Sequence, residues 1–152
     1  MKALTVVTHS EADMVLLAQA CHKAWHTKHF MCWLTGDLGA GKTTFVRAYL
    51  RAEGVSGAIK SPTFGMIERY AVGLHGVMHM DLYRLTDPES LWALDMPELI
   101  EKHTCFVEWP SLLKSIGMRP SIDMVLTVIT GGRHQIDITA APEWLENIPD
   151  RF

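Results

Sequence analysis

Apolar positions in the first third of the chain predict a helix, a buried strand and a second helix. Ser10 has the character of an N-cap, and apolar residues then recur at helical spacing between positions 14 and 25. The run Phe30 to Thr35 (FMCWLT) has the continuous apolar character of a strand that is buried on both faces. Beyond a glycine-rich stretch, Thr43 to Glu53 predicts a second helix, which Gly54 ends.

The middle of the chain predicts two strands followed by helices. Met66 to Val72 and Val77 to Leu82 have strand character, with a glycine-containing turn between them. Asp87-Pro88 predicts a helix start, because proline is favoured at the first helical position. Pro97 limits that helix, and a short second helix is predicted to follow through Lys102.

The last third of the chain predicts a short strand and a hairpin. Cys105 to Glu108 is an apolar segment that ends in a carboxylate. Asp123 to Thr130 and Gln135 to Thr139, joined across Gly131-Gly132, predict a C-terminal β-hairpin. The tail from Pro142 is expected to be a short helix or irregular. This mixture of elements favours an α/β fold with a partly antiparallel sheet.

The composition fits a single globular domain over residues 1–152. The chain is 48% hydrophobic and 20% charged, which supplies enough apolar side chains for one core. No apolar run approaches the roughly 18 residues of a membrane span. The apolar stretch at the start is short and acidic residues follow it, so a secretory signal is not expected and a cytoplasmic protein is. The formal net charge of −3 provides no general basic field for nucleic acid.

Cysteine and histidine positions predict no zinc site. Cys21, Cys32 and Cys105 form no CxxC pair, and each lies in an apolar stretch, so we expect three small core residues. The eight histidines lack ligand spacing, and most are expected at the surface. His79 is expected to be half-buried on a strand.

The glycine-rich segment carries the strongest indication of chemistry. Eight consecutive residues fit G-x-x-x-x-G-K-[ST] at every fixed position: Gly36, Asp37, Leu38, Gly39, Ala40, Gly41, Lys42 and Thr43. The glycines let backbone N–H groups converge on phosphate oxygens, and the helix that follows favours an anion at its N-terminus. We expect Lys42 to contact the β- and γ-phosphates, Thr43 to ligate Mg²⁺ and Thr44 to contact the α-phosphate. The segment therefore predicts a nucleotide-binding, P-loop NTPase-like fold with a mixed sheet flanked by helices.

Polar residues at strand ends and in loops are candidates for the rest of the site. Asp81 and Glu108 each end a predicted strand, where a P-loop enzyme needs an acidic residue near the metal. From position alone, either carboxylate could hold Mg²⁺ while the other orients the attacking water. Thr63, in the Ser61-Pro62-Thr63 loop, is a candidate sensor of the γ-phosphate. Arg133, at the hairpin tip, is a candidate contact to a phosphate or the base.

Four segments in this order resemble the TsaE family, also called YjeE: GDLGAGKTTF, KSPTF, HMDLYRL and VEWP. The resemblance covers most of the span from Gly36 to Trp109. It implies a small bacterial ATPase that is required for making threonylcarbamoyladenosine on tRNA together with TsaB and TsaD. TsaD is the threonylcarbamoyl transferase of that group, so the resemblance implies that tRNA is met indirectly, through the complex.

The resemblance also implies roles for individual residues. Gly36 to Thr44 become the phosphate site, and Mg²⁺ is assigned to Thr43 and Glu108. Asp81 then becomes the candidate for positioning or activating water.

Further contacts follow from the same resemblance. The Ser61-Pro62-Thr63 loop corresponds to a switch-like segment, and Trp109 to a tryptophan beside the metal carboxylate. Ser10 and Arg133 lie where nucleotide contacts outside the P-loop would be made.

Three other functions stay open at this stage. A small-molecule kinase would need an arginine-bearing lid, but Arg119, Arg133 and Arg151 are well separated. A GTPase of the usual kind would carry an Asn/Thr-Lys-x-Asp motif, whereas Asn147 is the only asparagine. A nucleotide-gated binding module that barely hydrolyses ATP has no sequence feature against it.

Overall fold

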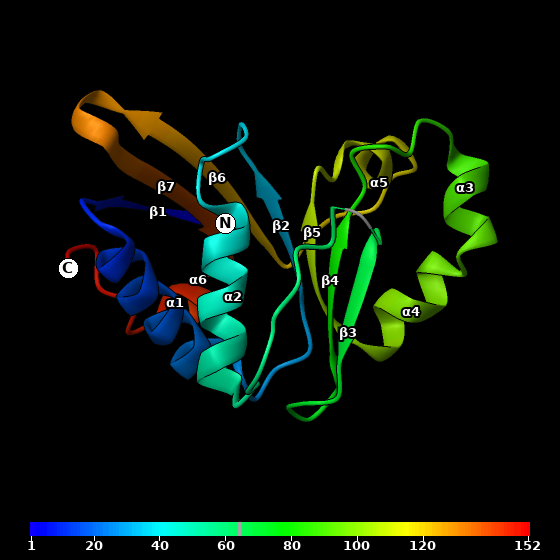
Figure 1. Ribbon diagram of the computed structural model, residues 1–152, viewed down its shortest axis with the longest axis horizontal. Coiled ribbons are helices and arrows are strands. Elements are labelled where there is room, and N and C mark those ends of the chain that lie inside the picture. The colour runs from blue at the N-terminus through cyan, green and yellow to red at the C-terminus, as the bar shows by residue number, and fades with distance from the viewer. Residues whose placement is uncertain (64) are drawn as a thin grey trace.

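The computed structural model describes residues 1–63 and 65–152, which form a mixed sheet with helices packed against it (Figure 1). Phe64, the last residue of the KSPTF segment, lies outside the described residues. The strands are β1 (Lys2–Thr8), β2 (Met31–Thr35), β3 (Ile67–Tyr70), β4 (Val77–Asp81), β5 (Thr104–Glu108), β6 (Ile122–Ile129) and β7 (Arg133–Ala140). The helices are α1 (Glu11–Trp25), α2 (Lys42–Glu53), α3 (Pro88–Ala93), α4 (Met96–Lys102), α5 (Ser111–Ser115), α6 (Pro142–Leu145) and the 3₁₀ turn η1 (Thr130–Gly132).

The sheet has a parallel centre and antiparallel edges. Its strand order is β1-β7-β6-β2-β5-β4-β3. β2 is parallel to both of its neighbours, β5 and β6, and β4 is parallel to β5. β3 pairs antiparallel with β4, and β7 pairs antiparallel with both β6 and β1. The predicted α/β fold, with a mixed sheet and a C-terminal hairpin, is confirmed.

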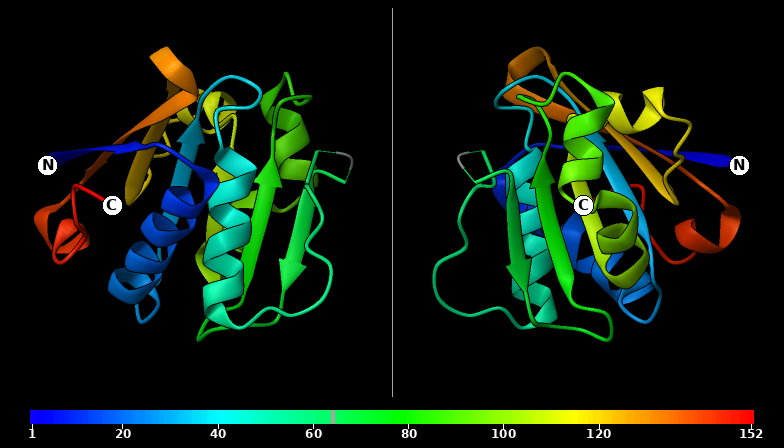
Figure 2. Two further views of the ribbon diagram at one scale, coloured as in Figure 1. Left: turned by 60° about the vertical axis from the view of Figure 1, so that its left-hand side comes forward. Right: turned by 90° about the vertical axis from the view of Figure 1, so that its right-hand side faces the viewer.

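Each face of the sheet has its own core and its own helices (Figure 2). α1 and α2 cover one face, over a cluster of aromatic side chains: Trp25, Phe30, Phe45, Tyr49 and Phe106. α3, α4 and α5 cover the other face, over a cluster rich in methionine: Met31, Trp33, Met78, Met80, Leu91, Met96 and Leu113. The continuous apolar character of β2 follows from this arrangement, because both of its faces are buried.

Alternation along β4 and β5 brings polar residues to one place. Val77 and Phe106 belong to the core under α1 and α2, so His79, Asp81 and Glu108 share that face at every second position. Asp81 is the register partner of Glu108 on the neighbouring parallel strand. Both carboxylates therefore lie at the carboxyl end of the parallel strands.

Local capping predictions are confirmed. The Ser10 side chain accepts a hydrogen bond from the Asp13 backbone N–H at the start of α1. Asp87 caps α3 in the same way, with Pro88 at the first helical position. Gly54 ends α2 in the left-handed conformation, at φ 109°. These features depend on neighbouring residues only, which is why sequence alone identifies them.

Two elements, β1 and α5, were not predicted. β1 buries Val6 and Thr8 but leaves most of its other residues partly or fully exposed, so its apolar signature is weak. Its pairing partner, β7, starts at Arg133, far away in the sequence. α5 is too short to show helical periodicity. The hairpin connection also lies slightly earlier than predicted: Thr130 joins the two glycines in η1, and β7 begins at Arg133 instead of Gln135.

The cysteines behave as core residues, as predicted. Cys21, Cys32 and Cys105 are buried and carry free thiols. Loss of solvation raises the pKa of all three thiols, that of Cys105 to about 12. Among the helices of residues 1–63 and 65–152, none is both long and apolar enough to cross a membrane.

Candidate nucleotide site

The glycine-rich loop lies between the end of β2 and the start of α2, where two of its glycines are required by geometry. A Cβ added to Gly36 would come within 2.5 Å of the Leu126 backbone oxygen on β6. Gly41 is the N-cap of α2 at φ 105°, a conformation that residues with a Cβ rarely adopt, and its Cβ would meet Met14 at 2.9 Å. The loop is therefore held tightly against the sheet on one side and α1 on the other.

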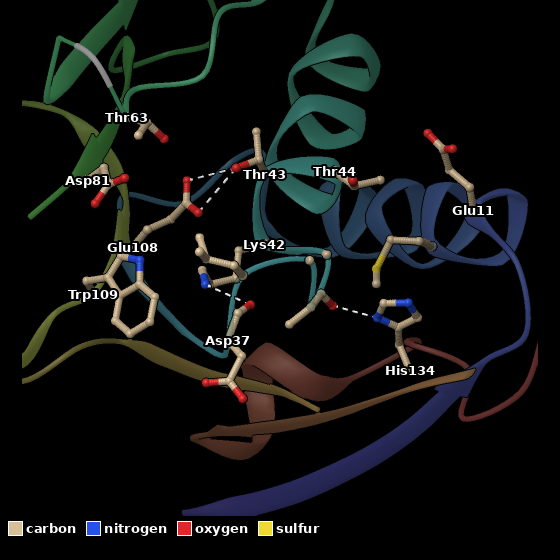
Figure 3. Close-up of a pocket in the computed structure, with 15 residues that line it drawn as sticks. Glu11, Asp37, Lys42, Thr43, Thr44, Thr63, Asp81, Glu108, Trp109 and His134 are labelled. Carbon is tan, nitrogen blue, oxygen red and sulfur yellow. Dashed lines mark hydrogen bonds between the residues drawn. The ribbon is translucent and has the colours of Figure 1, made fainter. Parts of the chain in front are cut away.

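A cavity of about 250 Å³ opens above this loop and the start of α2 (Figure 3). Residues from six separate parts of the chain line it: Glu11, Met14, Asp37, Leu38, Gly39, Ala40, Gly41, Lys42, Thr43, Thr44, Thr63, Asp81, Glu108, Trp109 and His134. A helix N-terminus with unpaired N–H groups beside a lysine is a favourable environment for phosphate. The cavity thus joins the predicted phosphate loop to both predicted carboxylates.

Lys42 is folded back onto its own loop. Its Nζ donates to the backbone oxygens of Gly36 and Asp37, the latter at 3.3 Å, and lies 4.3 Å from the centre of the Trp109 ring. Loss of solvation lowers the pKa of the Lys42 ammonium, and the charges of Glu108 and two aspartates act in the opposite direction. The ammonium has to leave these carbonyl oxygens before it can contact a phosphate.

Trp109 completes the wall of the cavity beside Lys42. Its backbone adopts φ 58°, an uncommon conformation for a residue with a Cβ, directly after β5 ends at Glu108. The Trp109 ring also lies against Tyr83, with 5.1 Å between ring centres. The turn of the backbone therefore places an aromatic face against the lysine ammonium (Figure 3).

Thr43 and Glu108 form the pair predicted for the metal. The Thr43 hydroxyl lies 3.2 Å from each carboxylate oxygen of Glu108, although 65 residues separate the two in sequence. The hydroxyl has a single hydrogen, which it donates to the carboxylate, so its lone pairs are left for a cation. Mg²⁺ is commonly bound through one or two carboxylates together with phosphate oxygens and waters, and this donor set fits that pattern.

Asp81 lies at the end of β4, next to the metal pair. Its Oδ1 accepts a hydrogen bond of 3.0 Å from the Tyr83 backbone N–H, and the residue is buried. No hydrogen bond joins Asp81 to Glu108 in the part of the chain that the structure describes. Thr63 lines the same cavity and shares a hydrogen bond of 2.8 Å with Ser61. Both predicted residues thus face the space above Thr43.

Three predicted contacts lie outside this cavity. Ser10 uses its hydroxyl to cap α1, and Arg133 donates from Nε to the Thr130 backbone oxygen at 3.0 Å. Neither side chain lines the cavity, so their proposed nucleotide contacts stay predictions without geometric support. Gly36 supports the loop from behind, next to β6, instead of lining the cavity.

The sequence missed several residues that the fold brings to the site. His134, on β7, forms a hydrogen bond of 2.7 Å between its Nδ1 and the backbone oxygen of Ala40 in the loop. Glu11 and Met14, at the start of α1, line the cavity. His79 was expected to be half-buried, but it is 1% exposed and contacts Glu108. Contacts between distant segments set all these positions, and the sequence alone offers only the spacing of His79 and Asp81 on one strand face.

The fold and this site together define an α/β protein of the P-loop class. A model of the TsaE family, described as threonylcarbamoyl adenosine biosynthesis protein TsaE, matches residues 8–136, and the chain belongs to that family. It is 35% identical over 133 residues to the tRNA threonylcarbamoyladenosine biosynthesis protein TsaE of Haemophilus influenzae, spanning 84% of this chain and 83% of that protein.

A sequence and a crystal structure from Bacillus subtilis extend the comparison. The tRNA threonylcarbamoyladenosine biosynthesis protein TsaE of that organism is 34% identical over 107 residues, which cover 70% of this chain and 67% of the relative. The crystal structure of YdiB superimposes with a TM-score of 0.72 at 24% identity, over 91% of this chain and 86% of that one. The family predicted from the four segments is therefore confirmed, and with it involvement in tRNA threonylcarbamoyladenosine biosynthesis.

Proposed function

We propose that this chain binds ATP or ADP with Mg²⁺ in the cavity above the glycine loop and hydrolyses ATP. The hydrolysis supports threonylcarbamoyladenosine formation on tRNA by TsaB and TsaD. The observation that carries the proposal is the position of the Thr43 hydroxyl, 3.2 Å from both oxygens of Glu108 and adjacent to Lys42 in one cavity. A P-loop enzyme needs this combination of lysine, hydroxyl and strand-end carboxylate.

The loop and Lys42 bind the phosphates in this proposal. Backbone N–H groups at the start of α2 donate to phosphate oxygens, and the helix dipole adds a favourable field for negative charge. Lys42 exchanges its contacts with the Gly36 and Asp37 carbonyls for the β- and γ-phosphates. In the free protein the Trp109 ring lies against the ammonium, and this contact loosens when Lys42 turns to the phosphates.

Thr43 and Glu108 would hold the metal, and Asp81 would position the water. Mg²⁺ when bound offsets negative charge on the phosphates. Glu108 keeps the Thr43 hydroxyl turned so that its lone pairs face outward. Asp81 Oδ1 accepts from the Tyr83 N–H, and its second oxygen, which bonds to no group of residues 1–63 and 65–152, can accept a hydrogen bond from water.

We expect hydrolysis by the isolated chain to be slow. Arginine is absent from the described residues that line the cavity, and an arginine supplied to such a site raises the rate by roughly 10³–10⁵. Thr63, in the Ser61-Pro62-Thr63 loop, lines the same cavity and is exposed, so a partner can read there whether the γ-phosphate is present. These features favour activation by a complex over independent enzymatic action.

ATP turnover with and without partners tests the proposal. The wild-type chain should hydrolyse ATP slowly alone, and addition of TsaB, TsaD and tRNA should change the rate. Thr63→Ala should reduce the response to partners more than it reduces ATP affinity, because the residue lines the cavity from the loop side. Thr5→Ala is the matched control, since that hydroxyl bonds to Asp137 on the exposed β1–β7 pair.

Two outcomes would contradict this reading. Fast hydrolysis by the isolated chain, unchanged by partners, would favour an independent enzyme such as a small-molecule kinase. Nucleotide binding without hydrolysis in every mixture would favour a nucleotide-gated binding module.

Trp109 should report nucleotide binding through its fluorescence. Its ring contacts both the Lys42 ammonium and Tyr83, so withdrawal of the ammonium toward a phosphate changes its surroundings. Mg²⁺–ADP should therefore alter the emission of the wild type, and Trp109→Phe should lose this change. The emission of the four remaining tryptophans, measured in Trp109→Phe, shows how much of the change comes from elsewhere in the chain. A full response in Trp109→Phe would show that another tryptophan is the reporter.

A further inference from the structure

Glu108 has a second partner, which lies behind it and outside the cavity. The His79 Nε2 is 2.6 Å from the Glu108 Oε2, and the two side chains are only 1% and 5% exposed. An ionised carboxylate can only accept hydrogen bonds, so the hydrogen of this contact lies on Nε2. His79 is absent from the residues that line the cavity, so it reaches a bound nucleotide only through Glu108.

The second ring nitrogen of His79, Nδ1, makes no hydrogen bond within residues 1–63 and 65–152 that would explain the position of the ring. Nδ1 is buried and has no hydrogen-bond partner among the described residues. Buried polar atoms are nearly always paired, so an unpaired one calls for a specific reason. The ring makes its recorded hydrogen bond through Nε2, to Glu108. The contact with Glu108 is therefore the specific reason for a histidine at this buried position.

The contacts on Glu108 come from two directions and fix its carboxylate plane. Thr43 approaches both oxygens from the start of α2, while His79 approaches one oxygen from the neighbouring strand. Asp81 is the register partner of Glu108, and His79 precedes Asp81 by two residues on the same strand face. One strand therefore supplies both the candidate water-positioning group and the support for the candidate metal ligand.

We propose that His79 is a positioning residue for the metal: it holds Glu108 in the orientation that presents the carboxylate to Thr43 and Mg²⁺. The inference rests on the proposed function, because it concerns the same site. Hydrogen-bond partners of metal ligands fix ligand orientation and strength, and their loss costs about 10–100-fold in metal affinity. His79 should therefore set Mg²⁺ affinity and leave metal-free nucleotide binding largely unchanged.

The test is a calorimetric titration of the ADP-saturated protein with Mg²⁺, which measures the affinity for the metal. His79→Leu should weaken Mg²⁺ binding by about 10–100-fold. His79→Gln should restore most of the affinity, because its amide nitrogen can occupy the place of Nε2. His79→Asn should not, since its shorter side chain places the amide near Nδ1 instead. The Gln and Asn variants are both polar and buried, so their difference reports the bond and not general packing.

A matched control is available on the other side of the same core. His22 contacts Glu53 through Nε2 and Oε2 at 2.5 Å, between α1 and the end of α2. His22→Leu removes a pair of the same chemistry that does not line the cavity, so Mg²⁺ affinity should stay at the wild-type value. In a Glu108→Gln background, His79→Leu should have no further effect on Mg²⁺ binding, as expected when one residue acts through the other.

Several results would overturn the inference. Wild-type Mg²⁺ affinity in His79→Leu, equal rescue by Gln and Asn, or full additivity of His79→Leu with Glu108→Gln would each reduce His79 to a core residue. Lack of any Mg²⁺-dependent ADP binding by the wild type would instead overturn the proposed function, and this inference with it.

Discussion

Lys42→Ala should weaken ATP binding by roughly 10- to 150-fold and abolish hydrolysis. A hydrogen bond to a charged group contributes about 1.5–3 kcal/mol, and 1.4 kcal/mol corresponds to a tenfold change in affinity. In the free protein the ammonium already bonds to the Gly36 and Asp37 carbonyls, and these contacts are given up on binding. The loss of ATP affinity should therefore lie nearer the tenfold end of this range.

The effect on turnover should be larger than the effect on affinity. Charge on the transferred phosphate and the leaving group grows in the transition state, so a lysine at the β- and γ-phosphates contributes more there than in the ground state. Titration calorimetry with ATP and a steady-state hydrolysis assay with saturating nucleotide measure the two effects separately.

The Lys42→Ala variant should fold normally. The ammonium is placed among carbonyl oxygens of its own loop, and no carboxylate forms an ion pair with it among the described residues. The control is Lys102→Ala, which removes an exposed lysine paired with Glu98 and should leave binding and turnover unchanged. Unchanged hydrolysis by a folded Lys42→Ala variant would exclude the P-loop as the catalytic site.

Glu108→Gln and Asp81→Asn should produce different defects, although their positions lie side by side in the sheet. Glu108→Gln keeps the shape of the buried side chain but removes the charge that faces Thr43. We expect the Mg²⁺ concentration for half-maximal turnover to rise about tenfold or more, from the loss of one charge-assisted contact. Thr43→Ala should show the same defect, because the two groups form one site.

Asp81→Asn should instead lower turnover with little change in nucleotide affinity. A carboxylate that positions or activates water contributes about 10²–10⁴-fold to the rate, and an amide of the same shape accepts from water less strongly. Asp123→Asn is the matched control, because that half-buried carboxylate lies on β6 outside the cavity. The assay is the rate of hydrolysis across a Mg²⁺ titration. If Asp81→Asn raised the Mg²⁺ requirement and Glu108→Gln did not, the two roles would have to be exchanged.

Sequence reasoning succeeded where short-range rules decide the structure. The Ser10 and Asp87 caps, the buried strand β2 and the loop from Gly36 to Thr43 all depend on residues close together in the chain. Asp81 and Glu108 could be placed at strand ends from their position after apolar runs. They lie close together because β4 and β5 are neighbouring parallel strands. The sequence places each residue at a strand end but does not show that the two strands are neighbours.

The remaining features depend on contacts between distant segments. β1 is identifiable only through its pairing with β7, and His134 reaches Ala40 because β7 lies at that edge of the sheet. Ser10 shows a different limit, since a serine at this position can serve as a cap or as a ligand contact. The hydrogen bond to the Asp13 N–H records the first role.

The contact between His79 and Glu108 shows what strand pairing adds to the information in the sequence. On the sequence, His79 is one histidine among eight, two residues before a candidate carboxylate. The parallel register of β4 and β5 converts that spacing into a buried contact of 2.6 Å with the candidate metal ligand. A residue without any recognisable motif thereby becomes part of the site.

The most direct test of the account is a calorimetric titration of the wild-type protein with ADP, in the presence and absence of Mg²⁺. The geometry of Lys42, Thr43 and Glu108 predicts saturable binding of one nucleotide per chain, tightened by Mg²⁺. Binding should be weakened by Lys42→Ala, and in Glu108→Gln it should need a higher Mg²⁺ concentration for the same tightening. No detectable binding by the folded wild-type chain at millimolar ADP, with or without Mg²⁺, would contradict the assignment of this cavity as a nucleotide site.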